Sequence, residues 1–198
     1  MPYTAIFGGT FNPLHVGHYE ILKALHEDPE VSEIFLMPDK IPPHKVCDFL
    51  AGDEVRIEMC RIAARDFSKA SLCLIEFERQ GKSYTFDTVT ELKHKYPDKD
   101  FAFVCGGDML VSFDKWYRYE ELAKMLPFIV FRRSDTENEL FDSAVERFRN
   151  MGMKIKVMDE TITAVASTGI RKDFNTAKAL LPEKIFEFLK NRGIYNVG

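Results

Sequence analysis

Six short apolar segments recur along the chain, and stretches with helical periodicity separate them. Nearly every position in these segments is apolar, which is typical of strands covered on both faces of a sheet. The segments span residues 3–7, 34–37, 72–75, 101–105, 128–131 and 155–158. Because strands alternate with helices and crossovers are right-handed, the pattern predicts a doubly wound, Rossmann-like α/β fold: a parallel sheet with helices on both faces.

The stretches between the predicted strands carry apolar residues three and four positions apart, as amphipathic helices do. Helices are expected over residues 16–26, 53–67, 85–96, 120–125, 141–151 and 183–191, with a short helix from 167 to 174. The alternation runs along the 198 residues without a Gly/Ser linker or an internal repeat. A single domain over residues 1–198 is therefore expected.

Charge and cysteine usage limit the classes of function. With 27 Lys and Arg against 31 Asp and Glu, the net charge is −4, which argues against a general nucleic-acid-binding protein. Cys47, Cys60, Cys73 and Cys105 form no C-x-x-C pair and are expected to be free, mostly buried thiols. The sequence has neither the pattern of a secretory signal nor an apolar run long enough for a membrane span. These features predict a soluble, cytoplasmic protein.

Ligands of such sheets bind outside the carboxyl ends of the strands, and the loop after the first strand has an unusual composition. Gly8 and Gly9 are expected to let the backbone turn tightly and approach a ligand. His15 and His18 lie three residues apart where a helix begins, so both imidazoles are expected to face one spot beside the free N–H groups. With the hydroxyl of Thr10, these residues predict a phosphate-binding loop without a Walker lysine.

A second phosphate-binding segment is predicted after the last strand. Ser167 is expected to be the N-cap of the short helix, and its hydroxyl and that of Thr168 are suited to phosphate oxygens. Arg171 lies one turn further along the same face and adds a charged, two-pronged donor. Taken alone, the segment is equally consistent with ordinary helix capping. Together with the first loop it predicts a triphosphate site.

The two segments, GGTFNPLHVGH and ASTGIR, resemble the H-x-G-H and I-S-S-T-x-x-R signatures of the nucleotidylyltransferase superfamily. Within it, PPHK, SYTFDT, GGDM and the region of Trp116 resemble the bacterial nicotinate mononucleotide adenylyltransferase family. The resemblance spans Ala5 to Tyr195, with the motifs in the same order. Val165 and Ala166 replace the Ile and the first Ser of the second signature, which affects only the ligand contact made by that serine.

The resemblance implies that ATP and nicotinate mononucleotide are converted to deamido-NAD and pyrophosphate. The phosphate of the mononucleotide would attack the α-phosphorus of ATP in line. Because this phosphate is already ionised, the protein would supply only positioning and charge stabilisation. Mg²⁺ would be bound mainly by the nucleotide and water, with no metal site made by the protein itself.

The resemblance also assigns roles to individual residues. The groups expected around the reacting phosphates are His18, His15, Thr10 and Arg171. Further contacts to ATP are expected from Gly8, Gly9, Phe11, Gly106, Asp108, Ser167 and Thr168. The mononucleotide is expected to contact His44, Lys45, Thr85, Trp116 and Arg133, with Trp116 stacking on the nicotinate ring and Thr85 near its carboxylate.

Other interpretations remain open at this point. Phosphopantetheine adenylyltransferase shares the first loop but lacks the PPHK and Trp-containing segments, and a non-catalytic nucleotide-sensing module would bind without turnover. An aminoacyl-tRNA synthetase fragment would need a K-M-S-K-S partner, which is absent. A zinc site could in principle use His15, His18, His44 and Cys47. The expected partners are small molecules rather than nucleic acid or membrane, and a homo-oligomer is left open.

Overall fold

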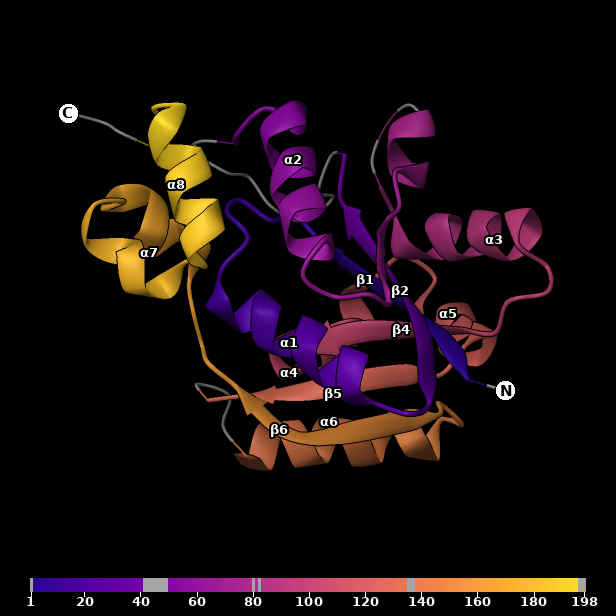
Figure 1. The fold of residues 1–198 in the computed structure, drawn as a ribbon. Helices are drawn as coiled ribbons and strands as arrows, with labels where there is room; N and C mark the ends of the chain where they lie inside the picture. The colour runs from indigo at the N-terminus through magenta and orange to yellow at the C-terminus, as the bar shows by residue number, and fades with distance from the viewer. Residues whose placement is uncertain (1, 41–49, 80, 82, 135–137, 196–198) are drawn as a thin grey trace.

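The computed structural model describes residues 2–40, 50–79, 81, 83–134 and 138–195. At its centre lies a six-stranded, all-parallel sheet with the strand order β3-β2-β1-β4-β5-β6 (Figure 1). The strands are β1 (Tyr3–Gly9), β2 (Val31–Pro38), β3 (Ala70–Leu72), β4 (Phe101–Gly106), β5 (Phe128–Arg133) and β6 (Ile155–Ile162). The predicted parallel α/β sheet is confirmed.

Helices follow the strands along the described chain. The α-helices are α1 (Val16–Glu27), α2 (Asp53–Ala64), α3 (Thr85–Lys95), α4 (Gly107–Val111), α5 (Tyr119–Met125), α6 (Asn138–Asn150), α7 (Ser167–Lys172) and α8 (Glu183–Asn191). Three short 3₁₀ helices, η1 (Ile75–Glu78), η2 (Phe113–Lys115) and η3 (Thr176–Leu180), complete the set.

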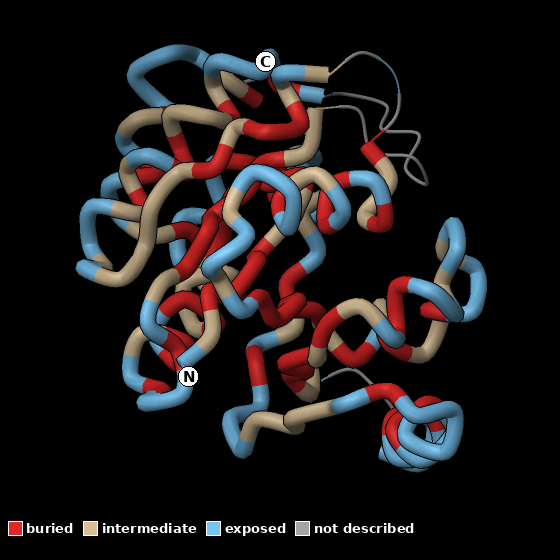
Figure 2. The backbone as a smooth tube through the Cα atoms, turned by 90° about the vertical axis from the view of Figure 1, so that its right-hand side faces the viewer, coloured by how far each residue is buried: buried red, intermediate tan, exposed pale blue. Residues whose placement is uncertain are grey.

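Two apolar cores lie on opposite faces of the sheet. One contains side chains of α1, α2, α7 and α8, and the other contains side chains of α3, α4, α5 and α6. Neighbouring strand residues alternate between them, so that Val104 of β4 packs in the first core and Phe103 in the second. Figure 2 shows the result, with buried strands in the middle and exposed outer turns of the helices. Burial on both faces explains why the strands are apolar throughout.

Most predicted elements are present with shifted ends. The third predicted strand, 72–75, is displaced: β3 begins at Ala70 and ends at Leu72, and Ile75 begins η1. The strand lies at the edge of the sheet and pairs only with β2, so the chain is free to leave it early. Helix α4 was not predicted, because its five residues are too few to show a period.

The order of the strands reverses between β1 and β4, since the chain first adds strands on one side of β1 and then on the other. In an open parallel sheet, a ligand crevice forms at such a switch point, outside the carboxyl ends of the strands. The loops that follow β1 and β4 therefore lie where a ligand is expected.

Two further expectations concern the chain as a whole. Cys60, Cys73 and Cys105 are free and buried, as predicted, and Cys47 lies outside the described residues. Within the described ranges, none of the helices has the length and hydropathy needed to cross a membrane.

Candidate active site

The loop after β1 turns at Phe11, whose φ of +46° lies in the left-handed region. Gly8 and Gly9 are instead the last two residues of the strand, so the prediction of a tight turn at these glycines is wrong. Gly9 has a different constraint, because a Cβ there would lie 3.1 Å from the ring of Phe11. That ring is buried and packs edge-on against Phe7. The glycine therefore makes room for the ring that anchors the loop.

His15 and His18 lie at the start of α1 and face one another. His15 is the N-cap residue, and its backbone N–H donates a hydrogen bond to Nδ1 of His18 at 3.1 Å. Their rings stack with centroids 3.7 Å apart, so the two imidazoles lie side by side at the start of the helix. A neutral imidazole that accepts at Nδ1 carries its proton on Nε2. His18 is therefore set to donate a hydrogen bond from Nε2.

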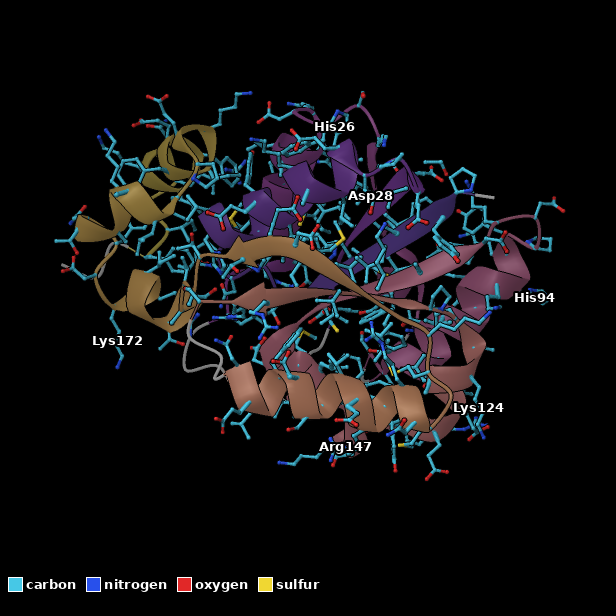
Figure 3. The ribbon with its side chains drawn as sticks, turned by 90° about the horizontal axis from the view of Figure 1, so that it is seen from below. His26, Asp28, His94, Lys124, Arg147 and Lys172 are labelled. Atoms are coloured by element: carbon cyan, nitrogen blue, oxygen red, sulfur yellow. The ribbon has the colours of Figure 1, made fainter. Side chains whose placement is uncertain are left out.

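The segment after β6 lies directly against the loop after β1. Arg171 of α7 donates from Nη1 to the carbonyl oxygen of Asn12 at 2.9 Å and from Nη2 to Oγ1 of Thr168 at 3.1 Å. Ser167 donates from Oγ to the carbonyl oxygen of Pro13 at 3.4 Å. The next side chain, Lys172, points outward (Figure 3). The two predicted phosphate-binding segments are thus brought together, as expected.

Ser167 differs from its prediction in one respect. The N-cap of α7 is Ala166, which has an extended backbone, and Ser167 is the first residue of the helix. The hydroxyl of Ser167 bonds to the loop after β1 instead of capping its own helix. The hydrogen bond from Ser167 to Pro13 thus links α7 to the loop after β1, whereas a capping bond would have stayed within the helix.

Asn12 joins three parts of the chain at the same loop. Its side-chain Oδ1 accepts hydrogen bonds from the backbone N–H of Ala51 at 3.1 Å and from the hydroxyl of Tyr195 at 2.5 Å. Its carbonyl oxygen accepts from Arg171. Asn12 is buried, so these bonds satisfy polar groups that water does not reach.

Helix α1 also holds the segment that leads from β6 to α7. A Cβ on Gly17 would lie 2.7 Å from the carbonyl oxygen of Thr163. One turn further, the carboxylate of Glu20 accepts from the backbone N–H of Thr163 at 2.7 Å and from its hydroxyl at 2.8 Å. The glycine of the first signature is therefore required for close approach to the second segment.

The ends of β4 and β5 bring another pair of predicted residues together. Asp108 follows β4, and its Oδ2 lies 3.3 Å from Nη1 of Arg133, the last residue of β5. A Cβ on Gly106 would lie 2.6 Å from Oδ1 of Asp108. Asp108, expected to contact ATP, and Arg133, expected to contact the mononucleotide, are thus neighbours at the ends of β4 and β5.

Aromatic residues gather around the start of α3. Thr85 is the first residue of this helix, where backbone N–H groups have no partner within the helix. The rings of Tyr84 and Tyr117 lie 4.8 Å apart, which brings the helix start beside the segment that contains Trp116. The indole of Trp116 is half-buried and packs edge-on against Phe103. This arrangement is suited to a flat ring with an anionic group.

The remaining predictions concern residues that the structure does not describe. His44 and Lys45 lie in the segment 41–49, outside the described residues, and so does Cys47 of the zinc interpretation. Among the residues that are described, no group of three or more His, Cys, Asp or Glu is arranged to hold a metal ion.

Two polar residues at the site, Asp39 and Arg56, were not predicted. The hydroxyl of Thr10 donates to the carboxylate of Asp39 at 3.1 Å, just after β2. Beneath them, Arg56 of α2 is completely buried and bonds to the carbonyl oxygens of both residues. The sequence did indicate that Arg56 is buried. It lies on the apolar face of its helix, with Met59 and Cys60 three and four positions further on.

The sequence is similar to those of known proteins. The model of a family described as cytidylyltransferase-like matches residues 6–173. Two curated bacterial relatives are each named "probable nicotinate-nucleotide adenylyltransferase". The Listeria welshimeri protein is 33% identical over 190 residues (96% of this chain and 95% of the relative). The Bacillus cytotoxicus protein is 35% identical over 199 residues (98% and 99%).

Solved structures share the fold at lower sequence identity. Plasmodium falciparum nicotinic acid mononucleotide adenylyltransferase complexed with NaAD superposes with a TM-score of 0.85 at 20% identity, covering 100% of this chain and 99% of that one. A putative nicotinate-nucleotide adenylyltransferase from Vibrio parahaemolyticus superposes with a TM-score of 0.69 at 19% identity, covering 100% and 98%. At these identities the likeness concerns the fold.

Proposed function

The chain belongs to the cytidylyltransferase-like family, and we propose that it transfers the adenylyl group of ATP to nicotinate mononucleotide. The products are deamido-NAD and pyrophosphate, in NAD biosynthesis. One observation carries the assignment. The guanidinium of Arg171 bonds to the carbonyl oxygen of Asn12, so the helix that begins after β6 meets the loop that leads to His15 and His18. A triphosphate that lies across this junction meets donors from both segments.

The chemistry requires little beyond positioning. The mononucleotide phosphate attacks the α-phosphorus, the bond to the bridging oxygen breaks, and pyrophosphate leaves with the electron pair. His18 donates from Nε2 to the phosphate oxygens on which negative charge develops, with His15 stacked against it. The hydroxyl of Thr10 turns from the Asp39 carboxylate to a phosphate oxygen when ATP binds. No side chain forms a covalent bond.

Other residues bind the rest of the ATP molecule. Arg171 holds the β- and γ-phosphates and stabilises the charge of the leaving pyrophosphate. The remaining contacts come from Gly8, Gly9, Phe11, Gly106, Asp108, Ser167 and Thr168. This assignment rests on the positions of these residues at the ends of β1 and β4 and at the start of α7.

The mononucleotide binds on the opposite side of the switch point. The N–H groups at the start of α3, together with Thr85, receive the carboxylate of the nicotinate ring, and Trp116 stacks on the ring. Arg133, next to Asp108, reaches the mononucleotide phosphate. His44 and Lys45 are proposed to contact this phosphate as well.

Mg²⁺ enters with ATP, and the phosphate oxygens and water supply most of its ligands. We further propose that residues 1–198 act as one domain in the cytoplasm, with small molecules as the partners in the reaction.

The direct test measures pyrophosphate release by the purified protein with ATP, Mg²⁺ and nicotinate mononucleotide. Release that requires the mononucleotide, together with deamido-NAD identified by mass spectrometry, supports the proposal. Parallel reactions with nicotinamide mononucleotide and with phosphopantetheine identify the acceptor. Turnover only with phosphopantetheine, or nucleotide binding without any turnover, would overturn it.

A further inference from the structure

A fully buried arginine lies beneath the candidate active site. Arg56 of α2 has no exposed surface. Its Nε donates to the carbonyl oxygen of Ala51 at 3.2 Å, and its Nη2 approaches the carbonyl oxygen of Lys40 at 3.4 Å and a carboxylate oxygen of Asp53 at 2.5 Å. Burial of a guanidinium is costly unless its donors are satisfied, and these donors are satisfied mostly by loop carbonyls.

The remaining nitrogen makes the contact that bears on function. Nη1 of Arg56 donates to the carbonyl oxygen of Asp39 at 2.5 Å and to that of Thr10 at 3.2 Å. The side chains of these same two residues bond to each other, from Oγ1 of Thr10 to Oδ2 of Asp39 at 3.1 Å. One guanidinium nitrogen therefore fixes the backbones of two residues whose side chains meet at the phosphate-binding loop.

We propose that Arg56 is a positioning residue for the adenylyl transfer, an inference that rests on the proposed function. It sets the distance between the loops that follow β1 and β2 and thereby directs the hydroxyl of Thr10 toward the reacting phosphates. Because the effect runs through backbone carbonyls, it depends on the planar, forked shape of arginine. A lysine has the charge but only one nitrogen, so it cannot hold both loops and α2 in the same geometry.

The experiment compares Arg56→Lys with Arg61→Lys. Arg61 lies on the same helix, is exposed and pairs with Glu58, so the control makes the same chemical change away from the loops. Both variants are assayed at a temperature at which circular dichroism shows them folded. We expect Arg56→Lys to lower kcat by about 100-fold, a loss typical of small misplacements at active sites, and Arg61→Lys to match the wild type.

A double-mutant cycle separates positioning from general support of the fold. If Arg56 acts through Thr10, then Arg56→Lys loses most of its effect on kcat when Thr10→Ala is already present. We expect less than about a threefold further loss in that background. Equal fold losses with and without Thr10 would overturn the proposal, and so would an Arg56→Lys variant as active as Arg61→Lys.

A milder pair of variants covers the case in which Arg56→Lys does not fold. Asp53 and Glu54 are both exposed acidic residues in the first turn of α2, but only Asp53 contacts Arg56. Asp53→Ala is expected to lower kcat several-fold relative to Glu54→Ala, and equal kcat values would contradict the inference. A wild-type protein without adenylyltransferase activity would instead refute the proposed function, so the two failures are distinguishable.

Discussion

The backbone N–H of His15 donates a hydrogen bond to Nδ1 of His18, and the same contact begins α1 and selects the tautomer of an imidazole at the candidate active site. In most helices with such a start, a Glu or Gln at the third position accepts this bond. Here His18 accepts the bond. One side chain therefore both caps the start of α1 and presents its Nε2 at the candidate site.

Because of this hydrogen bond, we expect His18→Asn and His18→Ala to lose similar activity but to differ in unfolding free energy. Asn keeps an acceptor near the position of Nδ1 but loses the donor at Nε2, whereas Ala loses both. We expect each variant to lower kcat by about 100- to 1,000-fold, as for the loss of one transition-state donor. Only His18→Ala should also lose about 1 kcal/mol of unfolding free energy. Steady-state kinetics and urea unfolding test this, and a fully active His18→Asn would contradict the role of Nε2.

Gly17→Ala should be destabilising although alanine is the better helix former. The added Cβ would meet the carbonyl oxygen of Thr163 at 2.7 Å, so the segment that leads to α7 has to move. Gly169→Ala in α7 is the matched control for stability, because nothing lies within 4 Å of its Cβ position. Unfolding free energies of the two variants are compared. If the Gly17→Ala protein were as stable as Gly169→Ala, the contact between residue 17 and Thr163 would not be what requires glycine here.

Arg171→Ala should weaken ATP use far more than Lys172→Ala. Arg171 bonds to Asn12 and Thr168, while its neighbour on the same helix points into solvent. A hydrogen bond to a charged group contributes about 1.5–3 kcal/mol, which corresponds to roughly 10- to 150-fold in kcat/KM for ATP. The measurement is kcat/KM at saturating mononucleotide. Similar values for the two variants would place Arg171 outside the triphosphate site.

Trp116→Ala should raise KM for nicotinate mononucleotide more than KM for ATP, because stacking concerns only the nicotinate ring. Tyr119→Ala is a suitable control, since Tyr119, like Trp116, packs against the ring of Phe113 and is half-buried. The control variant is expected to leave the ratio of the two KM values unchanged. An equal rise of both KM values in Trp116→Ala would assign the indole a packing role only.

The stability of the protein should fall as the pH rises above about 9. Burial raises the pKa of the Cys60 thiol and of the Cys105 thiol, so both stay neutral in the folded state. In the unfolded chain the same thiols ionise near the ordinary thiol pKa of about 8.5, which draws the equilibrium toward unfolding. Unfolding free energies at pH 8 and pH 10 should show the loss, and it should be smaller in a Cys60→Ala, Cys105→Ala double variant. An identical pH dependence in both proteins would contradict this assignment.

Local patterns in the sequence determined the architecture and the place of the site. Apolar runs and helical periods predicted the parallel sheet, and the bounds predicted for α8 are those observed, because residues 183–191 bury one face of the helix. The loop after β1 and the start of α7 were also recognisable, since glycine, histidine and hydroxyl residues at a helix start have a chemical meaning of their own.

Only the tertiary structure decided how these pieces contact one another. Arg171 bonds to Asn12 across 159 positions of sequence, Tyr195 bonds to Asn12 across 183, and Arg56 reaches Thr10 across 46. Pairing with β2 continues through Gly9, so the turn lies at Phe11, and the hydroxyl of Ser167 has a distant partner in Pro13. Periodicity reports which face of an element is buried, whereas the partner of a polar group depends on which loops the packed sheet brings together.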